Sequence, residues 1–497
     1  MSFNPSAEQQ AYFQWIQEST GNAIIEAVAG AGKSTTLVEG LRFMKGTTML
    51  TAFNKKAAED LQSKVSDQSR CEIGTVHSFG FRLFKANRKY PKLDAKAKHH
   101  SIMESSGIDV KYWWFYQQAL SLAKQSGFGV SGGPKRDDID AWVDLAEHHS
   151  LEDELPTSED DDCMELHEAL LSCPKLLSKS NYVTDFIDFD DMIYLPLVHD
   201  FPIPARYNNA LLDEAQDTNF VRRLLVERYF KDRFVAVGDP YQAIYGFTGA
   251  NNDSMEIISR HFNTTRLPLH TSFRCAQEVV REAQTYVPHI LSHPSAPMGS
   301  VTSVFEYDDP EWLRSVQPGQ VILCRNTKPL LGLCFRLIRM GKGAKVEGRK
   351  IGEGLKSLIR KFKWQSFEQL RGLLNDYRAK EVAQLKAKNK NMAAEFINDK
   401  VECIIALTDN CNRQTSAGLC EYIDTLFGDN LPGSVINLST IHKAKGREWS
   451  TVYWYGPNKF QPSVFARQQW ELDQERNLMY VAATRAKLHL RKILLEA

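Results

Sequence analysis

A glycine-rich turn near the N-terminus is the first segment whose residue types and spacing could do chemistry. It follows the apolar residues 23–28 and consists of Ala29, Gly30, Ala31, Gly32, Lys33, Ser34 and Thr35. Small residues let backbone N–H groups approach an anion, and the start of a helix adds partial positive charge. Lys33 could reach the β- and γ-phosphates of a nucleotide, and Ser34 could bind Mg²⁺. The turn predicts a phosphate-binding loop. An ordinary glycine-rich turn is the alternative, since Ala27 replaces the usual first glycine.

Two carboxylates, Asp213 and Glu214, directly follow the apolar residues 210–212. Asp213 could hold Mg²⁺ directly or through water, and Glu214 could orient and deprotonate an attacking water. An acidic helix cap is the alternative interpretation. We prefer the catalytic interpretation because the glycine-rich turn and the acid pair occur together and in the required order.

A third apolar run, residues 234–237, leads into Gln242, Tyr245 and Phe247. The neutral amide of Gln242 could sense a γ-phosphate or an attacking water. The two aromatic rings could stack on nucleic-acid bases, a contact that contributes about 1 to 3 kcal/mol per base. Packing into the core is the alternative for both rings.

The elements that position these residues are short strand-like runs with amphipathic, helix-like segments between several of them. The runs are residues 23–28, 210–212, 234–237, 321–323, 435–438 and 451–455. Their alternation with helices predicts parallel α/β sheets with functional loops at the carboxyl ends of the strands. Residues from about 91 to 181 and from about 354 to 427 lack such runs and are predicted to be mainly helical.

The composition, with 25% charged and 43% hydrophobic residues, excludes disorder and low complexity. No apolar run approaches the roughly 18 residues of a membrane span, and the N-terminus is polar, so we expect a soluble protein that is not exported. The net charge of zero hides 14 acidic and no basic residues in 137–168, and 17 basic against 7 acidic residues in 336–400. Because aromatic residues interleave the basic block, it is the better candidate for contacting phosphate.

In their order along the chain, these motifs resemble superfamily one helicases of the UvrD/Rep type. Residues 6–10 resemble the glutamine motif that reads adenine, and residues 189–192 resemble the acidic patch that precedes the acid pair. The other matching segments are residues 51–58, 74–79, 272–274, 438–449 and 477–486. Within the family, the chain is most similar to the helicase portion of F-box DNA helicases and to short phage or bacterial relatives.

The resemblance implies an α/β fold with two RecA-like P-loop NTPase domains, each with a parallel sheet and a mainly helical insertion. The first motor domain would comprise residues 1–90 and 182–265, with its insertion at 91–181. The second would comprise residues 266–353 and 432–497, with a short insertion at 354–431.

Site residues follow from the resemblance. Gln9 and Phe273 would hold adenine, residues 29–35 the phosphates, and Ser34 and Asp213 the Mg²⁺. The catalytic set would be Lys33, Asp213, Glu214, Gln242, Arg274 and Arg485. Glu448 would join the γ-phosphate sensors, and the two arginines would act as internal arginine fingers. DNA would be contacted by Phe53, Asn54, Thr75, His77, Tyr245, Phe247, Thr440 and His442. Thr35 and Thr248 stand where many family members have an arginine, which changes one nucleotide contact and one DNA contact.

The implied function is ATP-dependent, 3′→5′ translocation on single-stranded DNA with duplex unwinding, in DNA repair, recombination or replication. The alternatives are a translocase that mainly displaces bound proteins and a P-loop NTPase switch that acts through a protein interaction. Expected partners are single-stranded DNA and its junctions with duplex, together with single-strand-binding or recombination proteins, and no membrane. We expect a monomer, located in the cytoplasm of a bacterial or phage-infected cell or in a eukaryotic nucleus.

Overall fold

The computed structural model describes residues 4–65, 67–87, 91–156, 164–203, 205–244, 253–347, 351–387, 391–427, 435–463 and 466–496. It divides into two compact units, Met1–His270 and Thr271–Ala497. Each unit is built around one six-stranded sheet in which all strand pairs are parallel.

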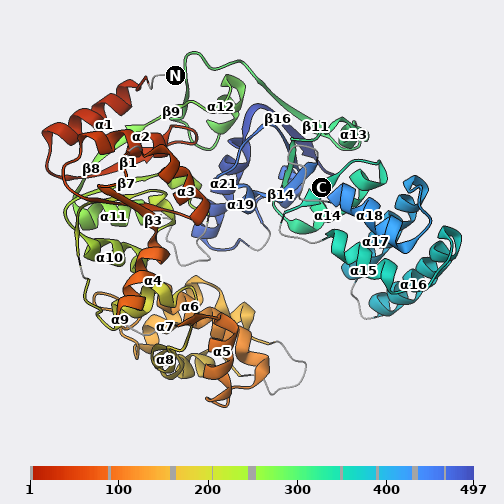
Figure 1. Ribbon diagram of the computed structural model, residues 1–497, viewed down its shortest axis with the longest axis horizontal. Helices are drawn as coiled ribbons and strands as arrows, with labels where there is room; N and C mark the ends of the chain where they lie inside the picture. The colour runs from red at the N-terminus through yellow and green to blue at the C-terminus, as the bar shows by residue number, and fades with distance from the viewer. Residues whose placement is uncertain are drawn as a thin grey trace. The chain divides into compact units, whose positions relative to one another are not determined.

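The sheet of the first unit has the strand order β3-β2-β6-β7-β1-β8. Its strands are β1 (Asn22–Ala27), β2 (Thr48–Ala52), β3 (Cys71–Thr75), β6 (Tyr207–Leu212), β7 (Phe230–Gly238) and β8 (Thr264–Leu269). The central strands are apolar on both faces because helices cover both sides. In Figure 1, α1 (Ala7–Glu18) and α2 (Lys33–Gly40) lie along one face, and α10 (Phe220–Tyr229) and α11 (Ser254–Phe262) along the other. The remaining helices are α3 (Lys55–Lys64), α4 (Val76–Asn87) and α9 (Asp191–Val198).

A helical lobe is inserted between α4 and α9, as predicted for residues 91–181. It contains α5 (Ala95–Glu104), α6 (Trp113–Ser126), α7 (Ile139–His148) and α8 (Leu166–Tyr182), shown in orange to ochre in Figure 1. At its base, β4 (Lys92–Leu93) pairs with β5 (Phe186–Ile187). Part of the acidic block, residues 157–163, lies outside the described residues.

A buried cluster of ion pairs joins the lobe to the chain that returns to the α/β part of the first unit. Lys124 Nζ on α6 lies 2.6 Å from Asp188 Oδ2 and 2.8 Å from Asp191 Oδ1. Lys98 on α5 pairs with Asp191, and both side chains are fully buried. Buried charges require such partners because unpaired ions lose their hydration without compensation. Asp191, which the sequence places in an acidic patch, is therefore a structural anchor between the lobe and α9.

The sheet of the second unit has the strand order β11-β16-β15-β12-β14-β13. The strands are β11 (Ser300–Phe305), β12 (Val321–Cys324), β13 (Ala344–Val346), β14 (Ile436–Thr440), β15 (Trp449–Tyr455) and β16 (Ala486–Leu494), and a separate pair is formed by β9 (Thr271–Ser272) and β10 (Leu291–Ser292). The helices that belong to the α/β part of this unit are α12 (Gln277–Ala283), α13 (Trp312–Ser315), α14 (Thr327–Arg339), α19 (Ile441–Ala444), α20 (Pro457–Phe460) and α21 (Gln469–Ala483).

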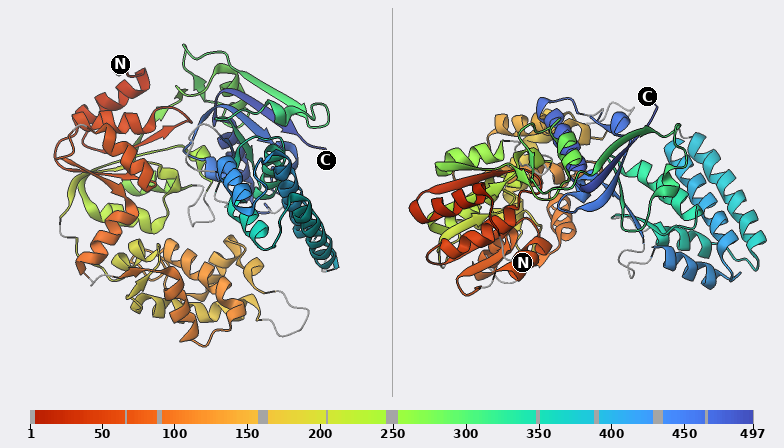
Figure 2. Two further views of the ribbon diagram at one scale, coloured as in Figure 1. Left: turned by 45° about the vertical axis from the view of Figure 1, so that its right-hand side comes forward. Right: turned by 90° about the horizontal axis from the view of Figure 1, so that it is seen from above.

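The second unit also carries a helical insertion, between β13 and β14. It consists of α15 (Ile351–Arg360), α16 (Phe367–Ala387), α17 (Asn391–Asn410) and α18 (Ser416–Phe427), which group together in both views of Figure 2. Two parallel α/β units, each with a helical insertion, confirm the predicted fold class. None of the described helices combines the length and the apolar character needed to cross a membrane.

The boundary between the units differs from the predicted one at residue 265. Strand β8 begins at Thr264 and pairs along its length with β1, so residues 266–269 belong to the first sheet. The division therefore lies between His270 and Thr271. The strand is partly exposed and mixed in polarity, with Arg266 and Pro268 among its residues, which is why the pattern of apolar residues did not reveal it.

Candidate functional site

The predicted phosphate loop connects the end of β1 to the start of α2. Gly30 and Gly32 adopt left-handed backbone conformations, with φ of 76° and 79°. Gly32 is the N-cap of α2 and offers no side chain to cap the helix, so backbone N–H groups of the first turn are left for another acceptor. A Cβ atom at Gly32 would also lie 3.3 Å from Gln9 Nε2. Ala29 and Ala31 are buried beneath this turn. The left-handed glycines and the uncapped start of α2 are compatible with binding of a phosphate by backbone N–H groups.

Gln9 braces the two helices next to this loop. Its Oε1 accepts a hydrogen bond from the Ser6 backbone N–H at 3.0 Å, which completes a capping box at the start of α1. Its Nε2 donates to Thr36 Oγ1 on α2 at 2.9 Å. The structure places Gln9 beside the phosphate loop, and its contact with adenine stays a prediction.

The acid pair lies at the end of β6, opposite the phosphate loop. Ser34 Oγ donates to Asp213 Oδ2 at 3.1 Å, although the two residues are 179 positions apart. Burial, and then the neighbouring charge of Glu214, raise the pKa of Asp213 to about 7, against the opposing effects of Lys33 and Ser34. A cation at this point would stabilise the ionised carboxylate. The hydroxyl and carboxylate that the sequence predicts as Mg²⁺ ligands are therefore brought together.

These two ligands fit a magnesium ion that is also bound by phosphates. In the described parts of the chain, no cluster of three or more His, Cys, Asp or Glu side chains could hold a metal ion by itself. Mg²⁺ is commonly bound through one or two carboxylates together with substrate phosphates. The donor set at Ser34 and Asp213 matches that mode.

A chain of side-chain hydrogen bonds extends from Glu214 to the third motif. Gln216 Nε2 donates to Glu214 Oε2 at 2.5 Å, and Gln216 Oε1 accepts from the Asp239 backbone N–H at 3.0 Å. Asp239 Oδ2 in turn accepts from Gln242 Nε2 at 2.7 Å. Glu214 has a φ of 53°, an uncommon conformation for a residue with a side chain, and such conformations concentrate at functional sites.

Gln216 and Asp239 link Glu214 to Gln242 through hydrogen bonds, and neither was given a role from the sequence. Their positions carried a signal, because Gln216 follows the acid pair by two residues and Asp239 directly follows β7. Both are buried. Burial, more than any other influence, raises the pKa of Asp239, while Lys33 and the bond from Gln242 oppose the rise.

Four predicted DNA contacts lie at or just after the ends of the neighbouring strands β2 and β3. Phe53 is 38% exposed. Asn54 Oδ1 caps α3 by accepting from the Ala57 N–H at 2.9 Å, and Thr75 Oγ1 accepts from the Ser78 N–H at 3.1 Å. Burial, and then the charge of Arg222, lower the pKa of His77 to about 4, so its ring is neutral at pH 7. Tyr245 and Phe247, as well as Thr248, lie outside the described residues.

A cavity of about 20 Å³ connects this surface to the acid pair. Phe53, His77, Asp213, Glu214 and Arg222 are among the residues that line it. Beside it, the ring of Phe189 is 62% exposed and meets His77 edge-on, with centroids 6.3 Å apart. In the sequence, Phe189 stands at the start of a segment that resembles an acidic patch, and nothing there marks its ring as exposed. Its exposed ring adds a second aromatic face to the predicted DNA surface.

In the second unit, the predicted nucleotide contacts cluster around the start of β16. Arg274 Nε forms an ion pair with Glu448 Oε2 at 2.6 Å, and Arg274 is the more accessible of the two predicted arginine fingers. Arg485 is 1% exposed and donates to the backbone oxygens of Val481 and Arg447 at 3.2 and 3.0 Å. Phe273 is 44% exposed, which is compatible with stacking on a base. Arg274, Glu448 and Arg485 are therefore brought together.

Thr440 and His442 lie where β14 runs into α19. Thr440 Oγ1 accepts from the Lys443 N–H at 3.4 Å, and burial is the main cause that lowers the pKa of His442 to about 4. Glu347 holds this segment in place, because its carboxylate accepts from Ser439 Oγ at 2.8 Å and from Arg447 Nη1 at 2.7 Å. The sequence offered no signal for Glu347, which is far from the motif along the chain.

Two protein-family models match the chain. The model of the UvrD/REP helicase N-terminal domain matches residues 7–263, and the model of the UvrD-like helicase C-terminal domain matches residues 204–496. Each of the two models by itself covers more than half of the chain.

Curated relatives include helicases from yeast and bacteria. The chain is 26% identical over 517 residues to F-box DNA helicase protein 1 of Schizosaccharomyces pombe, with 94% of this chain and 55% of the relative covered. It is 26% identical over 327 residues to ATP-dependent DNA helicase Rep of Escherichia coli, with 59% of this chain and 44% of the relative covered. For DNA helicase IV of Escherichia coli the identity is 23% over 320 residues, with 56% and 47% covered. The chain spans about half the length of the curated relatives it matches.

Proposed function

Because the chain belongs to the UvrD/REP helicase family, we propose that it is an ATP-dependent DNA helicase. The observation that carries the proposal is the contact between Ser34 and Asp213, since it brings the phosphate loop and the acid pair into one site. The relay from Glu214 through Gln216 and Asp239 to Gln242 supports it further. A glycine-rich turn with a purely structural role would not require these polar groups to converge in a buried place.

In this proposal each group of the first unit has a separate task on ATP. The backbone N–H groups of the loop and Lys33 bind the phosphates, and Glu214 accepts a proton from the attacking water. Gln216 holds the Glu214 carboxylate, and Gln242 reports whether the γ-phosphate is present. Ser34 and Asp213 would hold Mg²⁺, which when bound neutralises phosphate charge. Gln9 would contact the adenine.

The second unit would contribute Arg274, Glu448, Arg485 and Phe273 to the nucleotide. Arginine fingers stabilise charge that develops during phosphoryl transfer and increase the rate by about 10³- to 10⁵-fold. The ion pair with Glu448 supports Arg274 in this role because it orients a partly exposed guanidinium. The backbone carbonyls that hold Arg485 would keep its guanidinium in one orientation.

Single-stranded DNA would bind along Phe53, Asn54, Thr75, His77, Tyr245 and Phe247 of the first unit, and along Thr440 and His442 of the second. The exposed rings of Phe53 and Phe189 support base stacking on the first unit. Translocation with 3′→5′ polarity, unwinding of junctions, a monomeric state and action in the cytoplasm or the nucleus complete the proposal.

The test compares ATP hydrolysis with and without single-stranded DNA, and unwinding of matched duplexes with 3′ or 5′ tails. We expect DNA to stimulate hydrolysis and only the 3′-tailed duplex to be unwound. Lys33→Ala is the control, because it should abolish hydrolysis and unwinding while the far-UV circular dichroism stays unchanged. A rate of ATP hydrolysis that is the same with and without DNA would contradict the proposal. Displacement of a bound protein without any unwinding would favour the translocase instead.

A further inference from the structure

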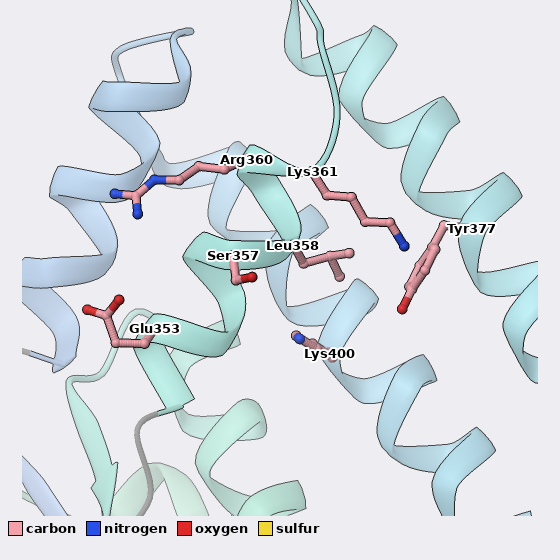
Figure 3. A pocket seen from close by; sticks show the side chains of 7 residues that line it. All are labelled: Glu353, Ser357, Leu358, Arg360, Lys361, Tyr377 and Lys400. Atoms are coloured by element: carbon pink, nitrogen blue, oxygen red, sulfur yellow. The ribbon is translucent and has the colours of Figure 1, made fainter.

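The helical insertion of the second unit contains a pocket that the proposed ATP and DNA sites do not use. It has a volume of about 530 Å³, and Ser357, Arg360, Lys361, Tyr377 and Lys400 are among its lining residues. The residues come from α15, the turn after it, α16 and α17. Figure 3 shows Lys361 extending toward Tyr377, with Lys400 below it, while Arg360 extends in the other direction. The pocket is therefore lined by positive charge from two helical segments.

Among the residues that the structure describes, the cations that line this pocket, Arg360, Lys361 and Lys400, form no ion pair with a carboxylate. Three carboxylates of the insertion are already paired with other cations: Glu353 and Asp424 each lie 2.7 Å from Lys356, and Glu402 pairs with Arg339. Glu353 is the acidic residue that lines the pocket, and its charge is balanced by Lys356. An anion from outside would be the matching counter-charge.

The two lysines are held near one another despite their repulsion. Burial, and then the charge of Lys361, lower the pKa of Lys400. Lys361 Nζ lies 4.5 Å from the centre of the Tyr377 ring, which fixes the side chain by a cation–π contact. Lys400 Nζ lies beside α15, at an ordinary contact distance of 3.8 Å from the position that a Cβ atom of Gly354 would take. Like charges that converge in a recess without a partner are the arrangement expected of an anion site.

We propose that this pocket binds a phosphate group through Lys361 and Lys400, with the hydroxyls of Ser357 and Tyr377 as further donors. The volume exceeds that of a phosphate alone and has room for an attached sugar. Two sources share this chemistry, the backbone of a DNA strand and a small phosphorylated molecule. The DNA source rests on the proposed function, whereas phosphate binding itself does not.

The first arm of the test measures binding of a 3′-tailed duplex to the full chain, without nucleotide, by fluorescence anisotropy at several salt concentrations. The variant Lys361→Ala with Lys400→Ala should raise the Kd at least about tenfold. It should also reduce the slope of log K against log salt concentration by about 2, because each lost lysine–phosphate contact means that about one counterion fewer is released on binding. The matched control is Lys363→Ala with Lys380→Ala, which removes the same charge from exposed positions of the insertion that do not line the pocket. Lys361→Arg with Lys400→Arg should retain binding if charge is what matters.

The second arm measures binding of inorganic pyrophosphate by calorimetry in a Lys33→Ala background, which removes the other phosphate site. Binding of pyrophosphate that the pocket variant abolishes would identify a small phosphorylated ligand. If the pocket variant lost affinity for DNA alone, the ligand of the pocket would be the backbone of a DNA strand. If the control pair weakened DNA binding as much as the pocket variant does, a diffuse basic surface would explain the binding and the proposed pocket would be wrong. If the pocket variant changed neither DNA binding nor pyrophosphate binding, the proposal would also be wrong. ATP hydrolysis without DNA should be unchanged in the pocket variant, which separates this test from a failure of the proposed helicase activity.

Discussion

Glu214 and His77 line the same small cavity, although one residue follows β6 and the other lies in the first turn of α4. Glu214 is the proposed base for ATP hydrolysis, and His77 belongs to the proposed DNA surface. The cavity of about 20 Å³ is close to the smallest volume that holds a water molecule. A shift of His77 on binding DNA would therefore change the surroundings of Glu214, the proposed base.

Replacing His77 by Ala is expected to weaken the coupling between DNA and ATP hydrolysis. The concentration of single-stranded DNA that gives half-maximal stimulation should rise about three- to tenfold, as expected for one lost hydrogen bond. Hydrolysis without DNA should change little. His100→Ala is the control, since it removes an exposed histidine of the helical lobe. A His77→Ala enzyme with normal DNA stimulation would remove His77 from the DNA surface.

Replacing Gln216 by Leu should lower the kcat of ATP hydrolysis about 10- to 100-fold. Losses of that size are typical when a side chain that orients a functional group by a hydrogen bond is removed. Gln216 holds Glu214 and the Asp239 backbone together, so its loss leaves the base poorly oriented. The KM for ATP should change little, since Gln216 lies behind the acid pair.

A double-mutant cycle distinguishes this positioning role from a general loss of stability. In a Glu214→Gln background, Gln216→Leu should lower kcat no further, because the group that it positions is already absent. Additive losses would show that Gln216 acts independently of Glu214.

The raised pKa of Asp213 predicts a pH dependence in the absence of Mg²⁺. Because the pKa is about 7 in the folded protein and 3.8 in the unfolded chain, the folded state binds more protons between these values. Asp213 therefore lowers the stability as pH rises from about 4 to 7, and its contribution is constant above that range.

This pH effect is measured as the Tm in EDTA, compared between wild type and Asp213→Asn from pH 5 to 8. The advantage of the variant over wild type should grow with pH up to about 7, which follows from the pKa of Asp213. For the same reason, wild-type affinity for Mg²⁺ should increase with pH across this range. A difference in Tm that does not vary with pH would contradict the raised pKa.

Replacing Lys124 by Met should destabilise the first unit by about 3 to 5 kcal/mol, because Asp188 and Asp191 would remain buried without a full counter-charge. Lys98→Met should cost less, since burial and the charge of Lys124 already lower the pKa of Lys98 to about 8 and its ionised form is less strongly favoured. Urea denaturation followed by circular dichroism measures both. Lys55→Met is the matched control: its pair with Glu59 is exposed, so it should cost less than about 1 kcal/mol. A loss as large for Lys55 as for Lys124 would contradict this assignment.

Local patterns in the chain were sufficient for the fold class, and they named the glycine-rich turn and the acid pair, which the structure brings together at Ser34 and Asp213. The glycine-rich turn, the acid pair and the apolar runs are contiguous, so each carries its own signal, and parallel strands place their loops at one edge of a sheet. The helical insertions were recognisable because they lack strand-like runs.

Contacts between distant residues could be decided only by the tertiary structure. Glu347 reaches Ser439 and Arg447, and Lys124 reaches Asp188 and Asp191, through distances along the chain that no local pattern specifies. Burial decided the charge states: His77 is neutral at pH 7 and Asp213 is hard to ionise because both have lost water. The spacing of residues along the chain was enough to identify the candidate chemical groups. Which of these groups come into contact, and how far each pKa is shifted, depends on how the chain packs.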